Sequence, residues 1–155
     1  NGWVRRDMSQ VLSYTTAEQK YEISSRLESI YPLEQEILEV ICSFGYSDDE
    51  VFGIRLAMDE ALINAIMHGN HGHEYKRIFV NLQVNSEWVE ISVRDEGNGF
   101  DLSCLFDPTT EEHLHDPHGR GIFLIREFMS EVTFNEIGNQ ITFLHRKSEG
   151  EPTVV

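Results

Sequence analysis

Apolar and polar residues follow two different rhythms along this chain, and the rhythms predict where strands and helices form. Strict alternation over residues 78–84 and 88–94 predicts two half-buried strands. The three residues between them form a tight connection, which predicts an antiparallel pair. Shorter apolar runs predict three further strands, at 20–24, 132–134 and 140–144.

Apolar residues at helical spacing predict three helices. Pro32 suits the first turn of the first helix. Ser47, with Glu50 three residues later, is the signature of a capping box and predicts the start of the second helix. Glycines and polar residues at 69–72 predict its end, and a third stripe predicts a helix over 121–129.

The order of these elements predicts a single α+β domain of two layers, with helices on one face of a mostly antiparallel sheet. The aperiodic connection 97–118 contains two prolines and many charges, so we expect it to be a lid over a binding site. Residues 1–18 are expected to be an N-terminal extension or linker, with a candidate edge strand near 10–14. The domain itself is expected at 19–147, followed by a tail at 148–155.

Composition narrows the classes of partner. The chain has 27 acidic and 12 basic residues and a net charge of −15, so its surface repels the phosphate backbone of nucleic acids. No apolar run approaches the roughly 20 residues that span a bilayer. Cys42 and Cys104 lie far apart without metal-ligand spacing. We therefore expect free thiols in a reducing cytoplasm and neither a nucleic-acid nor a membrane partner.

The second predicted helix carries a polar stripe that borders its apolar face. Glu60, Asn64 and His68 recur every four residues, so they share one side of the helix. An amide oxygen such as that of Asn64 is a suitable ligand for Mg²⁺ when nucleotide phosphates supply the other ligands. Glu60 could accept a proton from an attacking hydroxyl or water. The alternative is an ordinary helix border of hydrogen-bonded polar residues.

Two glycine-containing segments add candidate ligand contacts. Asp95 ends a predicted buried strand and could accept a hydrogen bond from an exocyclic amine, while Gly97 and Gly99 permit close approach of the backbone. The segment 118–122 opens a helix, whose free N–H groups can bind phosphate. Arg120 could pair with a phosphate or steady the lid. Each segment alone also fits an ordinary turn or helix start.

Histidines cluster at 68–73 and again at 113–118. Spacing of this kind can bind Zn²⁺ or Ni²⁺, but neither a cysteine nor a compact carboxylate set completes a site. We therefore interpret both clusters as solvated loop histidines.

In combination and in this order, the three segments resemble the N, G1 and G2 boxes of the Bergerat-fold (GHKL) ATPase superfamily. Within it, the chain resembles the bacterial anti-sigma-factor serine/threonine kinases over roughly residues 20–146. Histidine kinases lack a glutamate at the Glu60 position, and gyrase-like and MutL-like relatives are larger multidomain chains. Residues 134–136 and 138–142 also resemble the last strand pair of the anti-sigma kinases.

This resemblance implies a role for each matching residue. Glu60 would be the general base, Asn64 the Mg²⁺ ligand, and Asp95 the acceptor for the adenine amine. The nucleotide-binding set as a whole would comprise Asn64, His68, Asp95, Gly97, Gly99, Gly119, Arg120, Gly121 and Thr142.

The implied function is that of an ATP- and Mg²⁺-dependent serine/threonine protein kinase that also acts as an anti-sigma factor. Its partners would be a sigma factor and a STAS-type anti-sigma-factor antagonist, which it phosphorylates, and a homodimer is common in that family. Two alternatives stay open: a nucleotide-gated protein-binding module with little or no kinase activity, and a hydrolytic ATPase domain of a larger machine.

Overall fold

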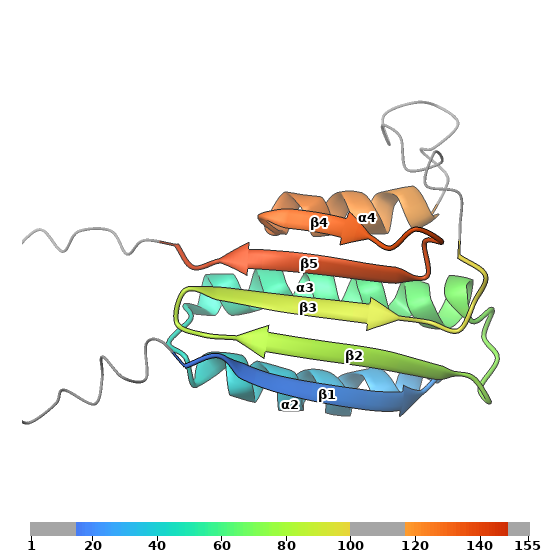
Figure 1. Cartoon of the computed structure of the whole chain (residues 1–155), viewed down its shortest axis with the longest axis horizontal. Helices are drawn as coiled ribbons and strands as arrows, with labels where there is room; N and C mark the ends of the chain where they lie inside the picture. The colour runs from blue at the N-terminus through green and yellow to red at the C-terminus, as the bar shows by residue number, and fades with distance from the viewer. Residues whose placement is uncertain (1–14, 100–116, 149–155) are drawn as a thin grey trace, which may run out of the picture.

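The computed structural model describes residues 15–99 and 117–148, which form a sheet with helices packed on one face (Figure 1). None of the described helices is both long and apolar enough to cross a membrane. Along the chain the elements are β1 (Ala17–Ser24), the short 3-10 helix η1 (Leu27–Ser29), α2 (Ile30–Cys42), α3 (Asp48–Asn64), the π-helical turn η2 (Ala65–Gly69), β2 (Arg77–Val84), β3 (Trp88–Arg94), α4 (Pro117–Phe128), β4 (Glu131–Phe134) and β5 (Gln140–Arg146).

The sheet has the strand order β1-β2-β3-β5-β4, and every neighbouring pair is antiparallel. β5 therefore lies between β3 and β4, so the last of the described strands is an interior strand of the sheet. The predicted two-layer α+β architecture is confirmed. β1 begins at Ala17, three residues before the predicted strand.

The core lies between the sheet and the helices. In β2, buried and half-buried residues alternate strictly, as expected for a strand with one face covered. α3 packs against both α2 and α4, so it is the central helix of its layer (Figure 1). The largest fully buried apolar side chains include Ile37, Ile41, Ile54, Met58, Leu62, Leu82, Ile91 and Phe143.

The predicted capping box starts α3. The N–H of Glu50 donates to the Ser47 hydroxyl (3.2 Å), and the N–H of Ser47 donates to Oε2 of Glu50 (2.8 Å). The other carboxylate oxygen of Glu50 accepts from the N–H of Ser148 (2.7 Å) and lies 3.1 Å from Nε2 of His145. Glu50 therefore also links, through hydrogen bonds, the end of β5 and the residues after it to the beginning of α3.

α4 begins earlier than predicted. It starts at Pro117 rather than at Gly121, because proline is favoured in the first helical turn, where its missing N–H costs nothing. Gly119 and Arg120 consequently belong to the first turn of α4. Most of the predicted lid, the candidate strand near 10–14 and Cys104 lie outside the described residues.

Candidate functional site

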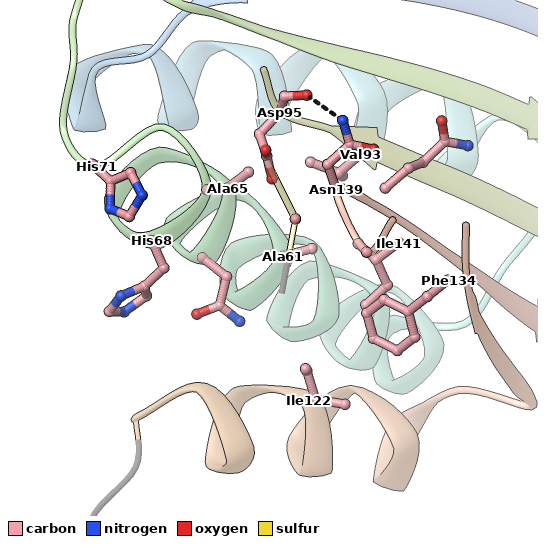
Figure 2. A pocket seen from close by; sticks show the side chains of 15 residues that line it. Ala61, Ala65, His68, His71, Val93, Asp95, Ile122, Phe134, Asn139 and Ile141 are labelled. Carbon is pink, nitrogen blue, oxygen red and sulfur yellow. Dashed lines mark hydrogen bonds between the residues drawn. The ribbon is translucent and has the colours of Figure 1, made fainter. Parts of the chain in front are cut away.

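A cavity opens where the C-terminal end of α3 faces the sheet and α4 (Figure 2). It measures about 220 Å³, against roughly 10–15 Å³ for a single water molecule, so a small organic ligand fits it. Its walls are mostly apolar and include a few polar side chains, which is typical of ligand sites. The lining residues are Ala61, Asn64, Ala65, His68, Gly69, His71, Val93, Asp95, Gly99, Ile122, Phe134, Gly138, Asn139, Gln140 and Ile141.

The cavity lies beside the π-helical turn η2, which continues α3 without a break. The N–H of Asn70 donates to the carbonyl of Ala65, five residues earlier, at 2.8 Å. π turns inside helices are rare and occur frequently at functional sites. This turn carries His68 and Gly69 to the cavity wall. The sequence analysis did not predict it.

Asp95 is the buried acid of the cavity. It follows β3 directly and is 8% exposed. Burial raises the pKa of its carboxyl group, although the hydrogen bond from Gly97 and nearby cationic groups oppose that rise. Among the described residues, only the N–H of Gly97 donates to the Asp95 side chain, at 2.7 Å. The carboxylate therefore has unfilled acceptor capacity next to the cavity.

Three glycines allow the backbone segments around Asp95 to approach one another. A Cβ atom on Gly69 would lie 2.1 Å from Oδ2 of Asp95, and one on Gly97 would lie 2.1 Å from the carbonyl oxygen of Gly69. Gly99 has φ +81°, and a Cβ there would lie 1.6 Å from the carbonyl oxygen of Ile137. The predicted close approach at Gly97 and Gly99 is therefore between parts of this chain, and Gly97 does not line the cavity.

Glu60 and Asn64 meet α4 at Gly121. A Cβ on Gly121 would lie 2.8 Å from Oε2 of Glu60 and 2.9 Å from Nδ2 of Asn64. Both polar side chains are half-buried, and neither forms a hydrogen bond with another described residue. Asn64 lines the cavity, and Glu60 lies one helical turn before it on the same side of α3. Two half-buried polar groups beside a cavity are suitably placed to bind a ligand.

Asn64 is the residue here that fits a magnesium site. The described residues contain no group of three or more His, Cys, Asp or Glu side chains that could hold a metal ion by themselves. Mg²⁺ commonly takes only one or two protein ligands and completes its shell with phosphate oxygens and water. The Asn64 amide, at the cavity wall and without a protein partner among the described residues, meets that requirement.

Comparison with known proteins shows the family of this chain. A family model described as a histidine kinase-like ATPase domain matches residues 23–144. The chain belongs to the histidine kinase-like ATPase domain family. The fold and the resemblance predicted from the three sequence segments are thereby confirmed, and the family name implies that this domain uses ATP.

Curated relatives of this ATPase domain are named serine-protein kinase RsbW or anti-sigma F factor. Serine-protein kinase RsbW of Bacillus licheniformis is 28% identical over 127 residues, which cover 75% of this chain and 79% of the relative. RsbW of Oceanobacillus iheyensis is 29% identical over 97 residues, covering 59% and 61%. The anti-sigma F factor of the same organism is 31% identical over 87 residues, covering 54% and 59%. This chain thus spans less than two thirds of the length of both Oceanobacillus relatives.

A solved structure shares the fold. The crystal structure of the RsbU and RsbW domains of Rv1364c from Mycobacterium tuberculosis matches 90% of this chain and 35% of that chain, with a TM-score of 0.60. Only 16% of the residues are identical, so this similarity supports the fold alone.

The structure of the ATPase domain brings several of the predicted site residues together. Asn64, His68, Asp95 and Gly99 line the cavity, and Gly121 borders it beside Glu60. The backbone of Gly119 and Arg120 lies in the first turn of α4.

The prediction for Thr142 is wrong. Thr142 lies in β5 between Ile141 and Phe143, which are both buried against the helices. Because successive side chains of a strand point to opposite faces, Thr142 points to the open face of the sheet. It is not among the residues that line the cavity.

Several site residues were missed by the sequence analysis. Asn139 and Gly138, in the turn between β4 and β5, line the cavity. Asn139 lies next to Asp95, and His71 lies on the opposite side of the cavity (Figure 2). Apolar residues such as Ile122 and Phe134 were missed as well. The glycine and asparagines of the segment 135–139 are typical of a tight turn, but nothing local in that segment indicates that the turn lies against Asp95.

Proposed function

We propose that this chain is an ATP- and Mg²⁺-dependent serine/threonine protein kinase that acts as an anti-sigma factor and phosphorylates a STAS-type antagonist protein. The names of the curated relatives support the class of activity. The observation that carries the proposal is the cavity itself, which is lined by the buried acid Asp95 and by the amide of Asn64. Glu60 lies one helical turn before Asn64, and neither of these two side chains forms a hydrogen bond with another described residue.

Each residue has a chemical task in this proposal. Asp95 accepts a hydrogen bond from the adenine amine, and the apolar walls cover the faces of the base. Asn64 holds Mg²⁺, which when bound supplies positive charge against the phosphate oxygens. Glu60 accepts the proton of a serine or threonine hydroxyl, whose oxygen forms the new bond to the γ-phosphorus while the bond to the ADP oxygen breaks. In this proposal the N-terminal turn of α4 would face the phosphates, since Gly121, directly after that turn, adjoins Glu60 and Asn64.

The proposed partners follow from the same family resemblance. A sigma factor would bind the kinase while the antagonist is phosphorylated, and the unphosphorylated antagonist would displace it. The chain would act as a homodimer in the cytoplasm.

The substitution Glu60→Gln tests the catalytic part of the proposal. We expect phosphate transfer from labelled ATP to the antagonist to fall about 10²–10⁴-fold, because general-base catalysis contributes a factor of that size. ATP affinity, measured by calorimetry, should change by less than about threefold, because glutamine preserves the size of the side chain. Glu36→Gln, on an exposed site of α2, is the matched control and should transfer phosphate at the wild-type rate.

The outcome also separates the proposed kinase from its main alternative. Undiminished transfer by Glu60→Gln would exclude Glu60 as the base. Wild-type protein that binds ATP tightly and transfers no phosphate to any antagonist of its host would instead be a nucleotide-gated binding module. Steady phosphate release without a protein substrate would indicate a hydrolytic ATPase.

A further inference from the structure

Asn139 forms hydrogen bonds with both peptide groups that flank the Cα atom of Asp95. The N–H of Asp95 donates to the backbone carbonyl of Asn139 at 2.9 Å. The side-chain Nδ2 of Asn139 donates to the carbonyl of Asp95 at 3.4 Å (Figure 2) and lies 3.5 Å from the carbonyl of Gly97. One residue thus fixes the backbone on either side of Asp95, and with it the direction in which the Asp95 side chain leaves the backbone.

Asn139 is itself held in place by Asn135. The Nδ2 of Asn135 donates to Oδ1 of Asn139, which directs the amide hydrogens of Asn139 toward Asp95 and Gly97. Oδ1 of Asn135 also accepts from the N–H groups of Gly138, Asn139 and Gln140, at 2.9, 3.0 and 3.1 Å. The turn between β4 and β5 is therefore a closed hydrogen-bonded unit that presents Asn139 to the loop after β3.

The other side of the same loop is attached to the end of η2. The N–H of Glu96 donates to Oδ1 of Asn70 at 2.8 Å. Asn70 is fully buried and donates to the carbonyl of Arg77 (3.1 Å) and to the hydroxyl of Ser25 (3.2 Å). The Asp95 loop is thus held between two asparagines, but of these only Asn139 lines the cavity.

We infer that Asn139 is a positioning residue, which holds the Asp95 carboxylate in the orientation that accepts a hydrogen bond from the exocyclic amine of adenine. The inference rests on the proposed function of this cavity. The Asp95 side chain receives a single hydrogen bond from the described residues, so its direction depends mainly on the backbone that carries it. Asn139 acts on that backbone and therefore on the selectivity of the site for an amine.

The test compares two ligands that differ only in this amine. ATP carries the exocyclic amine, and purine riboside triphosphate lacks it. We expect the wild-type protein to bind ATP about 10–100-fold more tightly in calorimetry with Mg²⁺, because a site that hydrogen-bonds a polar group rejects the analogue without it. Asn139→Ala should reduce this ratio about 3–10-fold, through weaker binding of ATP alone, as expected for the loss of neutral hydrogen bonds.

Two further variants keep the test decisive. Asn139→Asp preserves the size of the side chain but places a carboxylate against two carbonyl oxygens, so it should reduce the ratio at least as much. Asn98→Ala changes an exposed asparagine of the same loop and should leave the ratio unchanged. Equal weakening of both ligands by the Asn139 variants, or no weakening at all, would overturn the inference.

Asp95→Ala distinguishes failure of this inference from failure of the proposed function. If Asp95→Ala abolishes the preference for ATP while both Asn139 variants retain it, the nucleotide site stands and the positioning role does not. If Asp95→Ala itself retains the preference, the assignment of Asp95 to the adenine amine is wrong, and the role of Asn139 is overturned with it.

Discussion

The two ends of α3 each lie beside a buried carboxylate, and the two carboxylates have different surroundings. At the N-terminal end, Glu50 accepts hydrogen bonds from the N–H groups of Ser47 and Ser148 and contacts His145. At the C-terminal end, Asp95 accepts one hydrogen bond from the described residues and otherwise adjoins a cavity. The protein thus fills the acceptor capacity of one acid and leaves that of the other open.

The pKa values move in opposite directions for this reason. Burial alone raises the pKa of Glu50, but the hydrogen bonds from Ser47, Ser148 and His145 outweigh it and lower the pKa to about 2. Burial also raises the pKa of Asp95, and its single hydrogen bond does not compensate. A buried carboxylate with filled acceptors stabilises the fold, whereas one with open acceptors beside a cavity is poised to bind a donor ligand.

Removal of the charge at Glu50 should have the largest effect on stability. We expect Glu50→Gln to lower the free energy of unfolding by about 3 kcal/mol, because the amide NH₂ faces donors that the carboxylate had satisfied. The measurement is urea unfolding at pH 7. Asp49→Asn is the matched control, since Asp49 is exposed in the same helical turn, and it should cost under about 1 kcal/mol.

The same variant also has a pH signature. The pKa of Glu50 in the folded protein, about 2, lies below the ordinary value of 4.5. The unfolded chain therefore takes up this proton first as the pH falls, and wild-type stability decreases between about 4.5 and 2. Glu50→Gln should lose this part of the decrease. An unchanged acid dependence would contradict the stabilising role of Glu50.

The effect of Asp95→Asn should fall on binding rather than on stability. We expect the Kd for ATP to rise about 30-fold, which corresponds to about 2 kcal/mol, through loss of a charge-assisted hydrogen bond. The free energy of unfolding should change by less than about 1 kcal/mol, because the amide oxygen of asparagine can still accept the one hydrogen bond, from Gly97, that the described residues donate to this side chain. Calorimetry and urea unfolding measure the two quantities. A stability loss as large as that of Glu50→Gln would remove the distinction between the two acids.

Glu34 of α2 sharpens the comparison, because it is buried and incompletely hydrogen-bonded among the described residues and does not line the cavity beside Asp95. It is 2% exposed, its Oε1 has no hydrogen-bond partner among the described residues, and Nε of Arg55 lies 3.9 Å from Oε2. Burial is the largest of the effects that raise the pKa of Glu34 to about 8. A hydrogen bond with Asp59 and the negative charge of Asp59 raise it further, whereas the positive charge of Arg55 lowers it. We expect Glu34 to keep its proton at neutral pH.

This proton makes stability depend on pH in the opposite sense to Glu50. The folded protein retains the proton between pH 4.5 and about 8, while the unfolded chain releases it, so stability falls as the pH rises through that window. Glu34→Gln should remove the fall and stabilise the protein at pH 9 by about 1 kcal/mol. Thermal unfolding of wild type and Glu34→Gln from pH 5 to 9 measures this pH dependence of stability. Glu36→Gln, at an exposed site on the same helix, is the control. Parallel curves for wild type and Glu34→Gln would contradict the prediction.

The parts of the fold that could be predicted are those set by residues close together in the sequence. The capping box at Ser47 and the alternation in β2 and β3 depend on residues close in sequence, and the structure contains each of them. The turn η2 was missed because it accompanies close contact between Gly69 and Asp95, which are far apart in the chain. No pattern in the sequence of one helix reports such a contact.

The same limit applies to the site. Asn64 and Asp95 were identified because each belongs to a recognisable segment. Asn139 was missed because its role comes from bonds to Asp95, 44 residues earlier. The error at Thr142 has a different origin, since the direction of a strand side chain depends on which neighbours face the core. Its position next to the buried Ile141 and Phe143 excludes it from the cavity.

Calorimetry of the purified chain with ATP and Mg²⁺ tests the central claim most directly, with the double variant Asn64→Ala, Asp95→Ala measured beside it. The account predicts one nucleotide bound per chain and an affinity reduced at least about 100-fold in the double variant, with both proteins folded by circular dichroism. A folded wild-type chain that releases no heat, or a double variant that binds ATP as tightly as wild type, would contradict it.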